Sequence, residues 1–179
     1  LMNHGIFSFG DNARESYERM IDLVSRAEQY LQGQGAWDLE SLATSGKPSN
    51  KPGNDRVRLA TLRKQVFEVT GFPVVMKTTR DAQALSFVQR SDIAAISQQG
   101  PATPDHVIRT KRLPLLAGNI DSYIKEYETY FQQHTDNAKE EKTMLDPAPR
   151  VILDREFGLS TVGRSVKDAA IVRDIYQHT

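Results

Sequence analysis

The feature that most constrains the fold is a stretch over residues 33–55 that is rich in glycine and proline. It contains four glycines and two prolines, and its apolar residues follow neither a helical nor a strand period. A segment of this length without secondary structure is uncommon inside one compact domain. The sequence therefore predicts two units, residues 1–34 and 55–179, joined by a linker over residues 35–54.

The charge and composition exclude several classes of protein. The 179 residues include 23 Lys and Arg and 23 Asp and Glu, which argues against a surface that tracks nucleic acid. Mean hydropathy is −0.51, and no apolar run approaches the roughly 20 residues of a membrane-spanning helix. Cysteine is absent, which excludes disulfides, thiolate metal sites and cysteine nucleophiles. We therefore expect no nucleic-acid or membrane partner and a cytoplasmic location.

The first unit is predicted to be a strand followed by a helix. Residues 6–9 are apolar and β-prone, and a helix is expected over residues 12–32. Asn12 and Glu15 have the spacing of a capping box, which satisfies free N–H groups at a helix start. The apolar residues that follow recur at intervals of three and four, as one helical face requires: Ala13, Tyr17, Met20, Val24, Ala27 and Leu31.

The second unit alternates between helical and strand patterns. Helices are expected over residues 55–70, around 120–131 and over 166–177. Strands are expected over residues 73–78, 84–88, 106–111, 150–153 and 159–162, with a helix from residue 82 as the alternative for 84–88. A tyrosine stripe at 123, 127 and 130 is expected to be core. This alternation predicts an α/β fold.

The two ends of the chain resemble each other at a constant offset of 153 residues. Residues 5–10 and 158–163 each place an apolar segment between two glycines, followed by a capping residue and a basic–acidic pair. Such a repeat is expected where the tail of one domain precedes a second domain of common ancestry. In this alignment His4 falls opposite Phe157.

Residues 1–6 (LMNHGI), with the helix that follows, resemble the C-terminal part of the class II aldolase/adducin family. In that family an N-H-G motif supplies the third histidine of a zinc site, together with an H-x-H pair and a nearby acidic residue. The resemblance implies that His4 is a Zn²⁺ ligand. The alternative is a half-buried imidazole that is bonded to a loop carbonyl.

Residues 100–111 (GPATPDHVIRTK) and 145–151 (LDPAPRV) are similar to a longer subfamily, the bifunctional rhamnulose-1-phosphate aldolase/alcohol dehydrogenase type. This resemblance implies the C-terminal piece of one aldolase-like domain followed by a second aldolase-related α/β domain. It also implies metal-dependent retro-aldol cleavage of a ketose 1-phosphate, a fused short-chain dehydrogenase that uses NAD, and self-association into a homo-oligomer.

The chain departs from the family pattern in two ways. Its four histidines include no H-x-H pair, and neither G-x-G-x-x-G nor Y-x-x-x-K follows a strand. The missing zinc ligands are therefore expected before Leu1, and the dehydrogenase is expected after Thr179. The chain is expected to be an internal fragment that is inactive by itself.

A substrate site is predicted at Asp105, His106, Arg109 and Lys111. On a strand, Arg109 and Lys111 would share one face and His106 would lie on the other, so the two cations would hold a phosphate or carboxylate. The alternative is that Asp105 caps a turn and the cations are solvated. Two other functions stay open, an adducin-like interaction module and a ligand-sensing domain that uses the Arg109 and Lys111 face.

Overall fold

The computed structural model describes residues 5–36, 52–116, 119–136 and 138–179, with only the backbone of 52–54. By internal contacts the chain divides into two units, Leu1–Ser45 and Gly46–Thr179. Each unit is described by itself.

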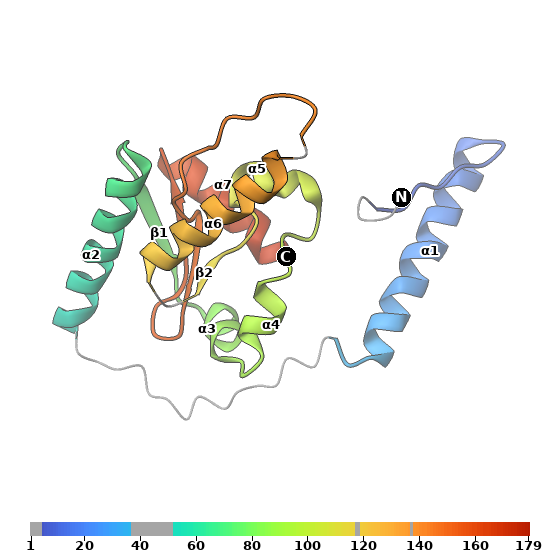
Figure 1. The fold of residues 1–179 in the computed structure, drawn as a ribbon. Coiled ribbons are helices and arrows are strands. Elements are labelled where there is room, and N and C mark those ends of the chain that lie inside the picture. The colour runs from blue at the N-terminus through green and yellow to red at the C-terminus, as the bar shows by residue number, and fades with distance from the viewer. Residues whose placement is uncertain (1–4, 37–51, 117–118, 137) are drawn as a thin grey trace. The chain divides into compact units, whose positions relative to one another are not determined.

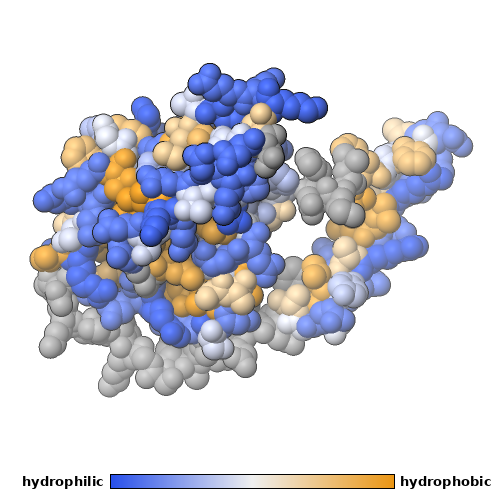
Figure 2. Space-filling model, viewed as in Figure 1, coloured by the Kyte–Doolittle hydropathy of each residue, from blue (hydrophilic) through white to orange (hydrophobic). Residues whose placement is uncertain are grey.

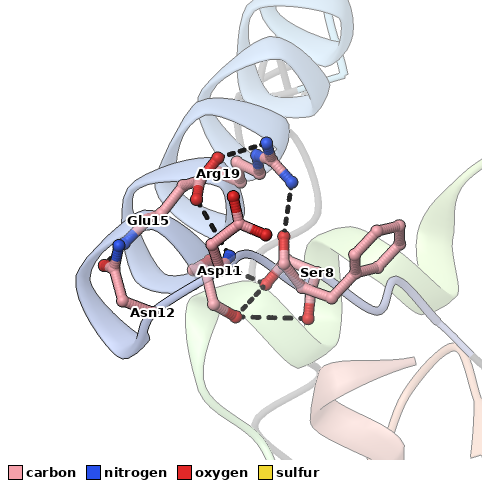
Figure 3. A network of polar contacts seen from close by, with 7 residues as sticks. Ser8, Asp11, Asn12, Glu15 and Arg19 are labelled. Carbon is pink, nitrogen blue, oxygen red and sulfur yellow. Dashed lines mark hydrogen bonds and ion pairs between the residues drawn. The ribbon is translucent and has the colours of Figure 1, made fainter.

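Unit 1 contains one long helix, α1 (Ala13–Gly33), as predicted. Its start is fixed by polar contacts (Figure 3): Asn12 Oδ1 accepts a hydrogen bond from Glu15 N at 3.0 Å, and Glu15 Oε2 accepts one from Asp11 N at 2.9 Å. Residues 6–9 were predicted to be a strand, and this is wrong for the described chain. They have no neighbouring strand to pair with among the described residues, so no ladder forms.

Unit 2 is built on a four-stranded sheet in the order β1-β4-β3-β2 (Figure 1). The strands are β1 (Val75–Thr79), β2 (Leu115–Leu116), β3 (Val151–Asp154) and β4 (Gly158–Gly163). β4 pairs antiparallel with both β1 and β3, whereas β2 pairs parallel with β3. Every residue of β4 is buried, because strands flank it and helices cover both of its faces.

Two apolar cores lie on opposite faces of this sheet. On one face, α2 (Pro52–Thr70) and α6 (Ile120–Thr135) pack against Ile152 and Val162. On the other face, α3 (Ala82–Gln89) and α7 (Val166–His178) pack against Leu153 and Leu159. The predicted α/β class is therefore confirmed.

Two predicted strands of unit 2 are helical. Residues 84–88 lie within α3, which confirms the alternative of a helix from residue 82; Asp81 caps this helix by accepting a hydrogen bond from Ala84 N at 2.8 Å. Residues 104–110 form the 3₁₀ turn η1 (Pro104–His106) and the short helix α5 (Val107–Thr110). A further short helix, α4 (Ile93–Ser97), follows α3. The predicted helices α2, α6 and α7 and the strands β1, β3 and β4 are confirmed.

The tyrosine stripe of α6 enters the core only in part. Tyr123 is buried, Tyr127 is half-buried and Tyr130 is 37% exposed. None of the helices in the described parts of the chain combines the length and the apolar character that crossing a bilayer demands.

Candidate anion-binding site

Residues 104–111 close into local turns in place of the predicted strand. Pro104 opens the turn, and its ring holds φ near the helical value. Thr110 Oγ1 donates a hydrogen bond back to the His106 carbonyl at 3.0 Å. Arg109 and Lys111 therefore do not share a strand face, and the two-cation clamp predicted from the sequence is wrong in its geometry.

Lys111 is turned into the protein. Its φ is 63°, and only 6% of the residue is exposed. Nζ donates to the Asp146 carbonyl at 2.6 Å and to the Tyr127 hydroxyl at 3.2 Å, and it lies 4.5 Å from the centre of the Tyr127 ring. Lys111 thus ties the segment 100–111 to the segment 145–151, and its amine is occupied by protein groups.

This burial changes the acidity of the amine. Desolvation lowers the pKa of Lys111 to about 8; the Asp146 carboxylate opposes the shift and the Arg150 guanidinium adds to it. The same surroundings raise the pKa of the Tyr127 hydroxyl, chiefly through its own burial and then through the Asp146 carboxylate.

A cavity of about 190 Å³ lies beside these segments, and three arginines line it: Arg109, Arg150 and Arg164. It is smaller than the roughly 300–1,000 Å³ pockets that hold drug-sized ligands. The rest of its wall is formed by Phe72, Ile108, Val162, Gly163, Asp168 and Val172. A cavity of this size suits a small anion or a single phosphoryl group.

The three guanidinium groups are held differently. Arg150 donates to Asp146 Oδ2 at 2.5 Å and to the Ala148 carbonyl at 3.2 Å. Arg164 lies over the Phe72 ring, with its guanidinium carbon 3.9 Å from the ring centre. Arg109 is exposed, and within the described part of the chain it has neither an ion pair nor a hydrogen bond. Arg109 therefore keeps all its donors for a ligand.

The start of α7 adds to the positive potential of the cavity. Ser165 caps this helix by accepting a hydrogen bond from Asp168 N at 3.1 Å, and Asp168 Oδ2 accepts one from Ser165 Oγ at 2.8 Å. The N-terminus of a helix carries a partial positive charge. With three arginines against the one carboxylate of Asp168, the lining favours an anion.

The other predicted site residues do not line this cavity. Asp105 is exposed, and His106 is half-buried with a buried Nδ1 that has no hydrogen-bond partner in the described chain. Asp146 Oδ1 is likewise buried without a partner among the described atoms. His4, the predicted metal ligand, lies outside the described residues.

Three lining residues have no role in the site predicted from the sequence: Phe72, Arg150 and Arg164. A signal existed for two of them, because Arg150 belongs to the segment 145–151 and Arg164 follows the second glycine of the repeat. Only the fold shows that these positions meet Arg109.

The cavity does not suit the zinc ion that the resemblance implies. Three guanidinium groups repel a cation, and only Asp168 offers a carboxylate. Across residues 5–36, 52–116, 119–136 and 138–179 no three His, Cys, Asp or Glu side chains group to hold a metal ion.

A comparison with family models matches residues 54–179, which contain all four strands of the sheet of unit 2, to "Aldolase class II, second domain". The chain belongs to this family. This second domain of the class II aldolase family includes the sheet, both cores and the arginine-lined cavity.

One relative is 24% identical over an alignment of 196 positions, an "Uncharacterized oxidoreductase YuxG" from Bacillus subtilis (strain 168). The alignment covers 97% of this chain but 27% of that protein, so the chain spans about a quarter of its relative's length. No solved structure matches the chain.

Proposed function

We propose that this second domain binds the phosphate of a phosphorylated sugar in the cavity formed by Arg109, Arg150 and Arg164. We further propose that it belongs to a protein that carries out metal-dependent retro-aldol cleavage of a ketose 1-phosphate, of the rhamnulose 1-phosphate type. The products of that reaction would be dihydroxyacetone phosphate and lactaldehyde. A fused short-chain dehydrogenase would then oxidise the aldehyde with NAD.

The single observation that carries the proposal is the free guanidinium of Arg109 beside two fixed ones. Arg150 is oriented by Asp146, and Arg164 is oriented by the Phe72 ring. Their positions are set before a ligand arrives, so binding need not order them. Arginine binds phosphate oxygens in a bidentate manner, and such charge-assisted hydrogen bonds are stronger than neutral ones.

The family match and the relative support the wider proposal at a coarser level. The resemblance to the class II aldolase family implies a phosphorylated sugar as substrate. A phosphate pocket in the domain that matches this family is consistent with that chemistry. The relative's name contains the word oxidoreductase, which is consistent with a dehydrogenase in the same polypeptide. None of the described residues is assigned to the bond-breaking step, so this chain's own contribution would be to hold the phosphate.

Calorimetric titration of the 179-residue chain with inorganic phosphate and with dihydroxyacetone phosphate tests the site. We expect Arg109→Ala to weaken binding about tenfold or more, because a hydrogen bond to a charged group contributes roughly 1.5–3 kcal/mol.

The matched control is Arg56→Ala, which removes another exposed arginine of the same unit from outside the cavity lining. We expect no change in affinity for this variant. Equal affinities of the Arg109 and Arg56 variants would contradict the phosphate site.

A further inference from the structure

The extended residues 5–10 and the helix α1 of unit 1 reproduce internal contacts of β4 and α7. Ser8 Oγ donates a hydrogen bond to the Ser16 carbonyl at 2.8 Å, and Thr161 Oγ1 donates one to the Ala169 carbonyl, also at 2.8 Å. Both members of the second pair lie 153 residues after those of the first. A side chain thus tethers the extended segment to the first turn of the helix in the same way in both places. Figure 3 shows Ser8 of the first pair.

The helix caps also correspond at this offset. Asn12 has φ −149° and ψ 167° and accepts a hydrogen bond from the N–H three residues on. Ser165 has φ −136° and ψ 167° and accepts the equivalent bond. The two caps therefore begin their helices in the same backbone conformation.

A close approach of backbone to helix recurs as well. A Cβ added to Gly10 would lie 2.8 Å from Ser16 N, and a Cβ added to Gly163 would lie 2.4 Å from Ala169 N. Each position requires glycine for the same reason, because any side chain would collide with the first turn of its helix. The side-chain hydrogen bond to the helix, the helix cap and the glycine at the close approach all support one alignment. In this alignment residues 5–10 correspond to β4.

The surroundings of the two segments differ completely. β4 pairs on both sides, and its Leu159 and Val162 are 5% and 1% exposed. In the described chain residues 6–9 form no strand ladder, and the equivalent Ile6 and Phe9 are 50% and 79% exposed. The segment therefore has the internal geometry of a central strand without its neighbours.

In an extended segment the side chains alternate between two faces, and this alternation shows which apolar residues of unit 1 lack a packing partner in the described chain. Ser8 faces α1, as its tether requires, so Phe7 and Phe9 point to the opposite face. In β4 that face bears Val162, which packs in a core with α2 and α6. Phe7 is 72% exposed in unit 1, and α1 adds exposed apolar residues such as Tyr17 and Ile21. Figure 2 shows apolar side chains at the surface of this unit.

We propose that residues 5–10 are the central strand of a second sheet, paired antiparallel on both sides by strands from another part of the same polypeptide, whose apolar layer covers Phe7 and Phe9. The relative that aligns with 97% of this chain is nearly four times as long as the aligned part, so such a polypeptide has ample chain for this sheet. The pairing on both sides follows from β4, which lies between two antiparallel strands.

Hydrogen exchange tests this assignment. Exchange of the amides of residues 6–9 is measured by mass spectrometry in the 179-residue chain and in the complete natural polypeptide that contains it. We expect exchange at least about 100-fold slower in the complete polypeptide, because central-strand amides open only with large-scale unfolding. Equal exchange rates in the two samples would overturn the proposal. Protection that rises with concentration in the 179-residue chain would also overturn it, because a second copy would then be the partner.

A substitution provides a second readout in the complete polypeptide. Phe9→Asp places a charge in the proposed apolar layer, and we expect faster exchange at residues 6–9 and a lower melting temperature. The control is Val57→Asp, since Val57 is also apolar and exposed, at 64%. We expect it to leave both measurements unchanged. Identical behaviour of the two variants would argue against a buried Phe9.

Discussion

At the scale of single residues, Lys111 belongs to a segment whose sequence motif marks the right region of the fold. The role predicted for Lys111, to bind a ligand together with Arg109, is not the one that the structure gives it. The segment 100–111 was expected to direct two cations at a ligand. In the structure one cation, Arg109, points into the cavity, while Lys111 bonds to Tyr127 and Asp146. A positive φ at Lys111 causes this division, and the residue pattern alone does not encode it.

The buried amine of Lys111 gives the free energy of unfolding a pH dependence with a definite sign. Its pKa is about 8 in the folded protein and 10.5 in the unfolded chain. Between these values the unfolded state binds more protons, so the contribution of Lys111 to stability rises with pH. Asp146, Arg150 and Tyr127 are the charged or titratable groups that face it.

We therefore expect the stability difference between the natural chain and Lys111→Met to shift in favour of the natural chain between pH 7.5 and pH 9.5. Urea unfolding at both pH values measures it. Lys125→Met, on the exposed side of α6, is the control and should show a constant difference. A Lys111 difference that does not change with pH would mean that the amine stays protonated.

Tyr123 and Tyr176 have pKa values that burial raises, so above about pH 10 their contribution to the free energy of unfolding falls as the pH rises, opposite to that of Lys111.

At the scale of elements, the long periodic helices and the buried strands could be predicted, because their patterns reflect packing on one sheet. The short elements could not. Val107 and Ile108 favour a strand by composition, yet they are 41% and 78% exposed and have no strand to pair with. Their helical conformation is set instead by the ring of Pro104 at the start of the turn and by the hydrogen bond from Thr110 Oγ1 to the His106 carbonyl.

The junction between β4 and α7 gives the clearest element-scale prediction. In Gly163→Ala the new Cβ would meet backbone atoms of Asp168 and Ala169, which cannot move without shifting the helix. We expect a loss of about 2 kcal/mol or more in the free energy of unfolding, measured by urea denaturation.

Gly71→Ala is the informative comparison for this variant. Gly71 has φ +70° but open space around it, so alanine there costs only the left-handed conformation, about 1–2 kcal/mol. If Gly163→Ala costs less than Gly71→Ala, the junction relaxes more easily than the contacts indicate.

At the scale of the whole molecule, the candidate site depends on three segments that are distant in sequence. Arg109, Arg150 and Arg164 come from α5, from the loop before β3 and from the turn between β4 and α7. No local pattern predicts that these positions converge, because the sheet order β1-β4-β3-β2 brings them together. The segments 100–111 and 145–151, which resemble the family, contain Arg109 and Arg150. They indicate the right regions of the chain but not how the arginines are arranged around the cavity.

The role of His4 as a metal ligand is tested at the same scale, in the complete natural polypeptide. The resemblance implies three histidine ligands, of which His4 is one. Removing one of three protein ligands should leave a site that holds zinc poorly. If the proposed function holds, we expect His4→Ala to lose most of the bound zinc, measured by elemental analysis of purified protein, and to lose the proposed cleavage of rhamnulose 1-phosphate. His178→Ala is the matched control, because His178 is an exposed residue of the last turn of α7.

The two readouts separate the metal site from the phosphate site. Arg109→Ala should raise the substrate concentration needed for cleavage while the zinc content stays unchanged, because the arginine-lined cavity carries no metal ligand set. His4→Ala should change the zinc content while phosphate binding by unit 2 stays intact, because every residue lining that cavity lies between residues 72 and 172. If His4→Ala keeps full zinc occupancy, then His4 is not a ligand. The proposed phosphate site of the second domain is not affected by that result, because the phosphate titration tests it separately.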